Sequence, residues 1–181
     1  LKNDDTLTPE ILFKQIKQLE ELFQLRRHLA VVEMPINKLE GKSILEIGSG
    51  SGGHSAIFQQ RGASVVTVDI TLERAISTAQ KLEMIQNGEG RAYRADAENL
   101  PFRDNSFDFV YSNGVLHHSE TTDKCIAEVY RVLKPGGSAV VMLYSRHSAM
   151  FWLNILPRAI FSGEIFRNSE AHWIGRLTEG K

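Results

Sequence analysis

A chain of 181 residues, 42% of them hydrophobic, is long enough for one globular domain with a sizeable core and too short for two. Its 21 Lys and Arg residues almost balance its 22 Asp and Glu residues, so charge gives no reason to expect nucleic acid as a partner, and a small molecule is the default ligand. The single cysteine, Cys125, excludes an internal disulfide and fits a reducing, cytoplasmic setting. No apolar run in the sequence predicts a membrane span, and no Cys/His spacing predicts a metal site.

The first predicted element is an amphipathic helix over about residues 8–28. Thr8, Pro9 and Glu10 form a typical helix start, with a capping hydroxyl, a proline at the first helical position and an acid in the first turn. Apolar residues follow at helical spacing, at Leu12, Ile16, Leu19 and Phe23. We therefore expect this helix to pack on the rest of the protein by one face.

From residue 43 onward, short apolar runs alternate with helical patterns, which is typical of β-α-β units in a mostly parallel sheet. Strands are predicted over about residues 43–47, 64–69, 91–95, 107–112 and 138–144. Helices are predicted over about residues 52–61, 71–85 and 121–133, the last of them ended by Lys134-Pro135-Gly136-Gly137 and carrying Cys125 on its apolar face as a buried core thiol. The expected fold is α/β, a three-layer, Rossmann-like, doubly wound sheet with an N-terminal helix.

A glycine-rich loop follows the first predicted strand, in the stretch SILEIGSGSGGH over residues 43–54. Gly48, Gly50 and Gly53 fit the G-x-G-x-x-G pattern of dinucleotide sites, while Gly48, Gly50 and Gly52 fit the G-x-G-x-G pattern of S-adenosylmethionine sites. Glycines let the backbone adopt positive φ and approach a ligand closely, beside the free N–H groups of a helix start. The loop by itself leaves both cofactors open.

Acidic residues near the predicted strand ends narrow the choice. Glu46, two residues before the first glycine, would repel a pyrophosphate but suits S-adenosylmethionine, which carries an ammonium and a sulfonium. Asp69 ends the second predicted strand, where a carboxylate can accept hydrogen bonds from the ribose of either cofactor. After the third predicted strand, the Asp96 carboxylate can accept a hydrogen bond from the adenine amine, and the Ala97 N–H can donate one to a ring nitrogen. The alternative for Asp96 and Glu98 is a solvated loop without a ligand.

In this order, the motifs resemble those of class I S-adenosylmethionine-dependent methyltransferases, of the small-molecule type similar to quinone-biosynthesis C-methyltransferases. The matching segments are ILEIGSGSGGHS (44–55), VVTVDIT (65–71), ADAENLPF (95–102), FDFVYSNGVLHH (107–118) and EVYRVLKPGG (128–137). The resemblance implies methyl transfer from S-adenosylmethionine to a small molecule by in-line displacement, with S-adenosylhomocysteine as product. The cofactor-binding residues that it implies are Glu46, Gly48, Ser49, Gly50, Gly52, Asp69, Ile70, Asp96, Ala97, Glu98 and Asn113.

The resemblance also implies a role for each part of this set. The glycines would line the methionine portion of the cofactor, with Glu46 near its amino group and a contact from Asn113 at the methionine end. Asp69 would hold the ribose, and Asp96 with Ala97 would read the adenine.

Histidines supply the candidates for acid–base chemistry. His117 and His118 follow the fourth predicted strand, whose carboxyl end borders the ligand crevice of an open α/β sheet. Either histidine can act as a base or orient the acceptor, since histidine titrates near neutral pH. The alternative is that neither has a catalytic role, one being packed in the loop and the other solvated. Tyr144, Arg146 and His147 are further candidates for substrate contacts.

We predict one methyltransferase domain over residues 1–181, with an N-terminal helical segment (1–40), a cofactor-binding core (41–145) and a lid or substrate-side segment (146–181). The last segment contains the apolar run AMFWLNILPRAIF, which can be a lid, an oligomer contact or core. The fold that the chain resembles ends in an antiparallel hairpin, for which the residues after Tyr144 offer no clear strands. We therefore expect the hairpin to be missing from a C-terminally truncated chain.

Two other functions stay open. A cofactor-binding module that is non-catalytic or depends on a partner would share the whole cofactor site. An NAD-dependent oxidoreductase is supported only by the overlapping G-x-G-x-x-G pattern, and Glu46 counts against it.

Overall fold

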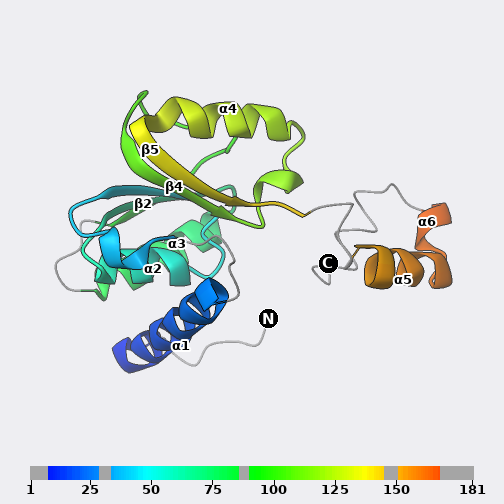
Figure 1. Ribbon diagram of the computed structural model, residues 1–181, viewed down its shortest axis with the longest axis horizontal. Coiled ribbons are helices and arrows are strands. Elements are labelled where there is room, and N and C mark those ends of the chain that lie inside the picture. Colours follow the sequence, from blue (N-terminus) through cyan, green and yellow to red (C-terminus); the bar gives the residue numbers. More distant parts are fainter. Residues whose placement is uncertain (1–7, 29–33, 86–89, 145–150, 168–181) are drawn as a thin grey trace. The chain divides into compact units, whose positions relative to one another are not determined.

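The computed structural model describes residues 8–28, 34–85, 90–144 and 151–167, and it divides into two compact units, Leu1–Leu143 and Tyr144–Lys181 (Figure 1). The first unit contains a five-stranded sheet of order β3-β2-β1-β4-β5 in which all neighbouring strands are parallel. The strands are β1 (Ser43–Ile47), β2 (Ser64–Asp69), β3 (Arg91–Arg94), β4 (Phe107–Asn113) and β5 (Leu133–Met142). The predicted α/β doubly wound sheet is confirmed.

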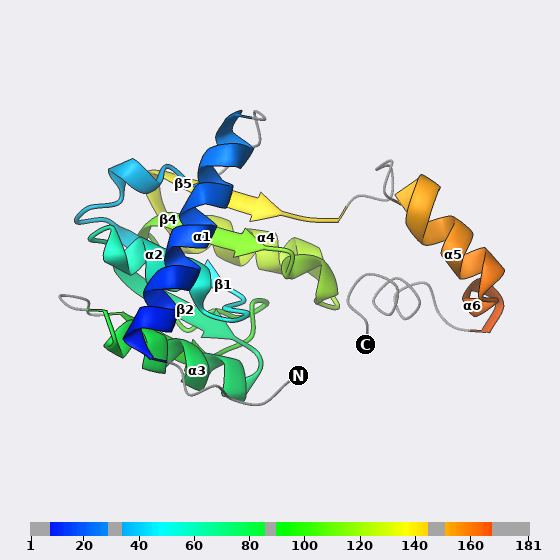
Figure 2. The ribbon, with the colours of Figure 1, turned by 90° about the horizontal axis from the view of Figure 1, so that it is seen from below.

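Helices cover both faces of this sheet. The elements are α1 (Pro9–His28), η1 (Ile36–Lys38), α2 (Gly53–Gln60), α3 (Leu72–Glu83), η2 (Leu116–His118) and α4 (Thr122–Val132). Figures 1 and 2 show α1, α2 and α3 on one side of the strands and α4 on the other. No helix in the described part of the chain combines the length and apolarity that crossing a bilayer requires.

The core consists of one apolar cluster on each side of the sheet. Along β1, Ile44 packs with residues of α1 and α2, whereas Leu45 packs with residues of α4, as the two-residue period of a strand requires. Cys125 is fully buried in the α4 cluster, and this burial raises the pKa of its thiol. The predicted core thiol is thereby confirmed.

The start of β5 differs from the prediction. We expected a strand from Ser138 after a loop over Lys134-Pro135-Gly136-Gly137, but β5 begins at Leu133, directly after α4. Phe107 of β4 pairs with Leu133, and Phe109 pairs with Ser138, so the Lys134–Gly137 stretch is an irregularity within the ladder. Among the residues that the structure describes, no antiparallel strand follows β5.

The second unit has its own small set of helices. Its described elements are the π-helical turn Phe151–Ile155, α5 (Leu156–Phe161) and α6 (Glu164–Arg167). Ile155 and Ala159 are buried together, with Phe151 packed against them. The role of this unit as lid, oligomer contact or core stays a prediction, and Arg146 and His147 lie outside the described residues.

A polar latch joins the starts of β1, β4 and β5. Asp108 accepts hydrogen bonds at one carboxylate oxygen from the Ser43 N–H (2.9 Å), the Ser43 hydroxyl (2.6 Å) and the Lys134 ammonium (2.9 Å). These donors hold the pKa of Asp108 well below its ordinary value, because they stabilise the charged form. The latch lies at the amino ends of the parallel strands.

We expect Asp108→Asn to lower the free energy of unfolding at pH 7 by about 1–2 kcal/mol, since an amide oxygen accepts these bonds more weakly. The folded-state pKa is lower than the unfolded one, so the carboxylate's contribution is complete well above pH 4 and is lost as the pH falls further. Urea unfolding of both proteins at pH 7, 4 and 2.5 should show the difference shrinking with acid. A difference that stays constant over this range would contradict the role of the charge.

Candidate cofactor-binding site

The carboxyl ends of the parallel strands bring the predicted site residues to one edge of the sheet. The glycine loop follows β1, Asp69 ends β2, and Asn113 ends β4. Asp96 follows β3, where the Ala95 N–H donates to the Asp69 carbonyl at 3.0 Å. In open α/β sheets this edge forms the ligand crevice.

The three glycines of the G-x-G-x-G pattern all have positive φ, but they face different surroundings. A Cβ at Gly48 would overlap the side chain of Val115, and one at Gly52 would lie 2.8 Å from the Thr78 hydroxyl. A Cβ at Gly50 would meet nothing within 4 Å. Gly48 and Gly52 therefore allow close packing of the loop, whereas Gly50 leaves its backbone open to a ligand.

The remaining glycine of the loop, Gly53, packs against α1. It begins α2 without a positive φ, and a Cβ there would lie 2.6 Å from the terminal methyl group of Leu19, a flexible side chain that can move aside. Neither backbone conformation nor this contact therefore requires a glycine at the third position of the G-x-G-x-x-G pattern.

Lys81 makes a hydrogen bond to the glycine loop that the sequence did not predict. It lies in α3 and is only 8% exposed, and its ammonium donates to the carbonyl oxygen of Ser51 in the glycine loop. Burial lowers the pKa of this amine. A lysine near the end of an amphipathic helix is usually solvated, so no sequence signal marked it.

The glycine loop and the end of β2 meet through hydrogen bonds to Asp69. The Ser49 hydroxyl donates to one oxygen of Asp69 at 3.2 Å, and the Thr71 N–H donates to the other at 2.9 Å. Asp69 is only 4% exposed, so these bonds set the direction of its carboxylate. The next residue, Ile70, is 67% exposed, so an apolar side chain follows β2 at this edge.

Glu46 lies beneath the first turn of α2. Its side chain shares the α2 face of β1 with Ile44, is 1% exposed, and accepts a hydrogen bond from the Ser55 hydroxyl. The Nδ1 of His54 lies 3.5 Å from its other oxygen, and the His54 ring packs edge-on against Tyr111. The strand pleat therefore directs this carboxylate into the helix–sheet layer.

The predicted adenine residues separate into two groups. Asp96 is exposed, and its carboxylate accepts a hydrogen bond from the Glu98 N–H at 2.9 Å. The carboxylate of Glu98 accepts a hydrogen bond from the Thr121 N–H at 2.7 Å and thus caps the start of α4, while Ala97 packs against the α4 core cluster. Of Asp96 and Glu98, Asp96 is therefore the exposed carboxylate.

The end of β4 carries the remaining candidates. The Ser112 hydroxyl is buried and donates to the Ile47 carbonyl at 3.0 Å, which ties β4 to β1 beside the half-buried Asn113. His117 and His118 follow in η2 with their ring centroids 4.0 Å apart, and His118 is the more exposed of the two. Both histidines lie after the carboxyl end of β4, as predicted.

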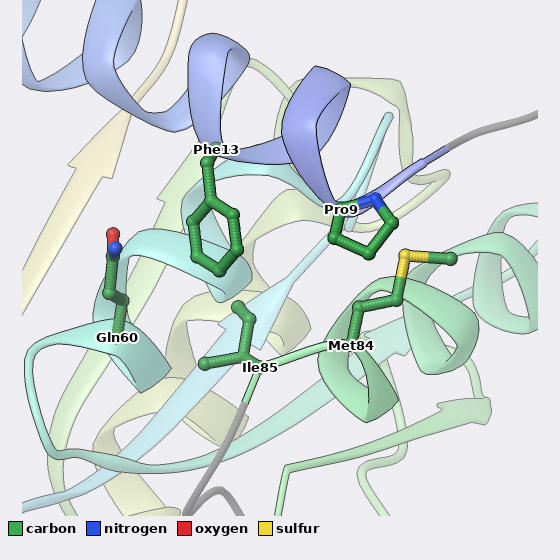
Figure 3. Close-up of a pocket in the computed structure, with 5 residues that line it drawn as sticks. All are labelled: Pro9, Phe13, Gln60, Met84 and Ile85. Carbon is green, nitrogen blue, oxygen red and sulfur yellow. The ribbon is translucent and has the colours of Figure 1, made fainter.

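A hollow of about 370 Å³ lies away from this edge, between α1 and the C-terminal ends of α2 and α3 (Figure 3). Its lining residues are Pro9, Phe13, Gln60, Met84 and Ile85. None of them is a predicted site residue or ionises, so the hollow offers no acid–base chemistry. In the described part of the chain, no group of three His, Cys, Asp or Glu residues is placed to hold a metal ion.

A parallel sheet with a glycine loop after its first strand and a fixed carboxylate at the end of its second defines an α/β protein built to bind a nucleoside-containing ligand. Residues 45–141, more than half of the chain, match the family described as "Methyltransferase domain", and the chain belongs to that family.

Relatives and solved structures agree with this membership. The chain is 34% identical over 147 residues to the ubiquinone/menaquinone biosynthesis C-methyltransferase UbiE of Haemophilus ducreyi, covering 74% of this chain and 55% of that protein. It is 29% identical over 126 residues to phosphoethanolamine N-methyltransferase 2 of Caenorhabditis elegans, covering 67% and 29%. An S-adenosylmethionine-dependent methyltransferase structure from Mesorhizobium loti superposes with a TM-score of 0.52 at 26% identity, covering 57% and 47%. The chain spans about half or less of the length of these proteins.

Proposed function

We propose that this protein is an S-adenosylmethionine-dependent methyltransferase that acts on a small-molecule acceptor. The observation that carries the proposal is the junction of the glycine loop with β2, where Gly50 has open space beside it and its neighbour Ser49, together with Thr71, orients the Asp69 carboxylate. Family membership supports it, as does the cofactor named for the Mesorhizobium loti structure.

The residues at this edge fit the parts of S-adenosylmethionine. The Gly50 backbone would border the methionine portion, Asp69 would accept hydrogen bonds from the ribose, and Asp96 would accept one from the adenine amine. The exposed side chain of Ile70 would cover one face of the adenine. When bound, the cofactor supplies a methyl group on a positively charged sulfur.

Three predicted residues have a supporting part in this proposal. Glu46 would position the first turn of α2 through Ser55 and would not contact the ligand's amino group directly. Glu98 would fix the start of α4, and Ser49 would orient Asp69. The reaction needs the acceptor held in line with the donor in a site that excludes water, so rigid supports of this kind matter.

The acceptor class follows from the relatives only in broad terms. The names of these relatives include transfer to nitrogen, in phosphoethanolamine, and to carbon, in quinone biosynthesis. We therefore propose a small-molecule acceptor without assigning the attacked atom. A cytoplasmic setting without a nucleic-acid partner rests on the composition alone.

His118 is the residue that we propose as base or orienting group for the acceptor, because it lies past the end of β4 and is exposed. His118→Ala should lower kcat by about 100-fold or more while leaving the affinity for S-adenosylhomocysteine unchanged. Turnover would be measured with an acceptor found by screening phosphoethanolamine and demethylated quinones, and His117→Ala would test the other histidine candidate in the same assay. Wild-type turnover in His118→Ala would remove this residue from the mechanism.

Calorimetric titration of the purified chain with S-adenosylhomocysteine, and separately with NADH, tests the cofactor assignment. We expect saturable binding of the first and none of the second. Binding of NADH alone would replace the proposal with a dinucleotide site, and binding of neither would contradict the site itself. Binding of S-adenosylhomocysteine without turnover of any acceptor would favour the non-catalytic or partner-dependent module.

A further inference from the structure

The loop that carries Asp96 is attached to the far end of α4 through an arginine. The guanidinium of Arg131 donates to the carbonyl oxygens of Leu100 (3.0 Å) and Phe102 (2.7 Å). It also donates to both carboxylate oxygens of Glu128, each at 2.7 Å, and to Asp104 at 2.8 Å. One side chain thus joins two backbone carbonyls of the loop to the helix that covers this face of the sheet.

Glu128 completes this attachment by accepting a hydrogen bond from the loop itself. Its carboxylate receives the Leu100 N–H at 2.7 Å as well as two N–H groups of Arg131. Hydrogen bonds from Arg131 lower the pKa of Glu128, and those from Glu128 raise the pKa of Arg131, so both groups stay charged at neutral pH. Two parallel N–H···O bonds between guanidinium and carboxylate give a fixed geometry that a lysine cannot reproduce.

The same loop is held near Asp96 by a second contact. Glu98 bonds to the Thr121 N–H at the start of α4, and its own N–H donates to the Asp96 carboxylate at 2.9 Å. From Asp96 to Asp104 the loop has no regular secondary structure, so side-chain contacts set its conformation: these two attachments, and the packing of Leu100 and Phe102 in the α4 core cluster. Arg131 and Glu128 hold the Leu100–Phe102 end, four to six residues beyond Asp96.

We propose that Glu128 and Arg131 are positioning residues for the adenine end of the cofactor site, an inference that rests on the proposed function. They contact the loop backbone and hold Asp96 where its carboxylate can accept a hydrogen bond from the 6-amino group of adenine. Without them the loop occupies other conformations. The apparent affinity for the cofactor then equals the intrinsic affinity multiplied by the fraction of molecules whose loop stays in the binding conformation. Selectivity for an amino group over a carbonyl at that ring position falls as well, because it depends on the placement of one carboxylate.

The experiment compares the affinities of S-adenosylhomocysteine and S-inosylhomocysteine, which differ at the 6-position of the purine. Wild-type protein should prefer the adenosyl ligand by about tenfold or more, as expected for one hydrogen bond to a charged acceptor. Arg131→Met should reduce this preference to less than about threefold, and Arg131→Lys should not restore it, because the fork geometry is lost. Glu128→Gln should reduce it as well and serves as the test if Arg131→Met does not fold.

Two variants separate positioning from general loss of stability. Asp108→Asn weakens the latch at the opposite edge of the sheet, and Asp104→Ala removes only the contact of Arg131 to a side chain that is 67% exposed. Both should keep the wild-type ratio of affinities. A wild-type ratio in Arg131→Met and Glu128→Gln would overturn the positioning role, whereas failure of the wild-type protein to bind either ligand would overturn the proposed function and this inference with it.

Discussion

Gly50→Val is expected to raise the dissociation constant for S-adenosylhomocysteine by about 100-fold or more, which corresponds to about 2.7 kcal/mol. Gly50 has a φ of 53°, and its added side chain would project into space that holds no protein atom within 4 Å. In the proposed site that space belongs to the methionine end of the cofactor, so the valine would exclude the ligand. Isothermal titration of both proteins measures the effect.

Strain must be separated from exclusion in this variant, because valine at positive φ costs on the order of 1–3 kcal/mol wherever it is placed. Gly41 supplies the matched control. It is exposed, has a φ of 67°, and also has nothing within 4 Å of a built Cβ, but it lies before β1 at the opposite edge of the sheet. Gly41→Val should lower the melting temperature by a similar amount and bind the ligand like wild type. Equal affinities in both variants would show that the glycine loop is not the binding site.

Asp69→Ala is expected to weaken S-adenosylhomocysteine binding by about 10- to 100-fold, the loss of about 1.5–3 kcal/mol from hydrogen bonds to a charged acceptor. The Ser49 hydroxyl and the Thr71 N–H orient this carboxylate in the wild-type protein, so its remaining acceptor positions are available to ribose hydroxyls. The measurement is the same titration, repeated with the 2′-deoxy form of the ligand. Wild type should bind the deoxy ligand more weakly, and Asp69→Ala should bind both alike.

Loss of the Thr71 hydrogen bond could also disturb the start of α3, so Asp69→Asn is the companion variant. Its amide oxygen can still accept from the Thr71 N–H while the negative charge is gone. An intermediate affinity for Asp69→Asn, with a melting temperature near that of wild type, would assign the effect to the charged acceptor. Unchanged affinity in Asp69→Ala would remove this residue from the site.

The fold could be predicted from the sequence where local signals and the burial of the strands agree. β1 and β2 span the residues predicted for them, because each is a short apolar run bounded by glycine or by a helix start. β5 shows the limit of such signals. Its Pro-Gly-Gly stretch is a typical helix stop and turn, yet pairing of Leu133 with Phe107 extends the ladder across it. Strand pairing is a contact between distant segments, which a local pattern does not contain.

The sequence by itself determined the α/β class and the edge of the sheet where a ligand would bind. It also determined that Gly50, Asp69 and Asp96 lie at that edge, since these features depend on where the short strand segments begin and end. Only the tertiary structure decided the surroundings of each side chain. The pleat of β1 places Glu46 under α2, and the packing of α4 takes the Glu98 carboxylate to cap a helix. The contact of Arg131 with the Asp96 loop, like that of Lys81 with the glycine loop, joins segments about 30 residues apart. Such contacts exist only once the helices have packed on the sheet, because nothing in the spacing of a single segment records its partner.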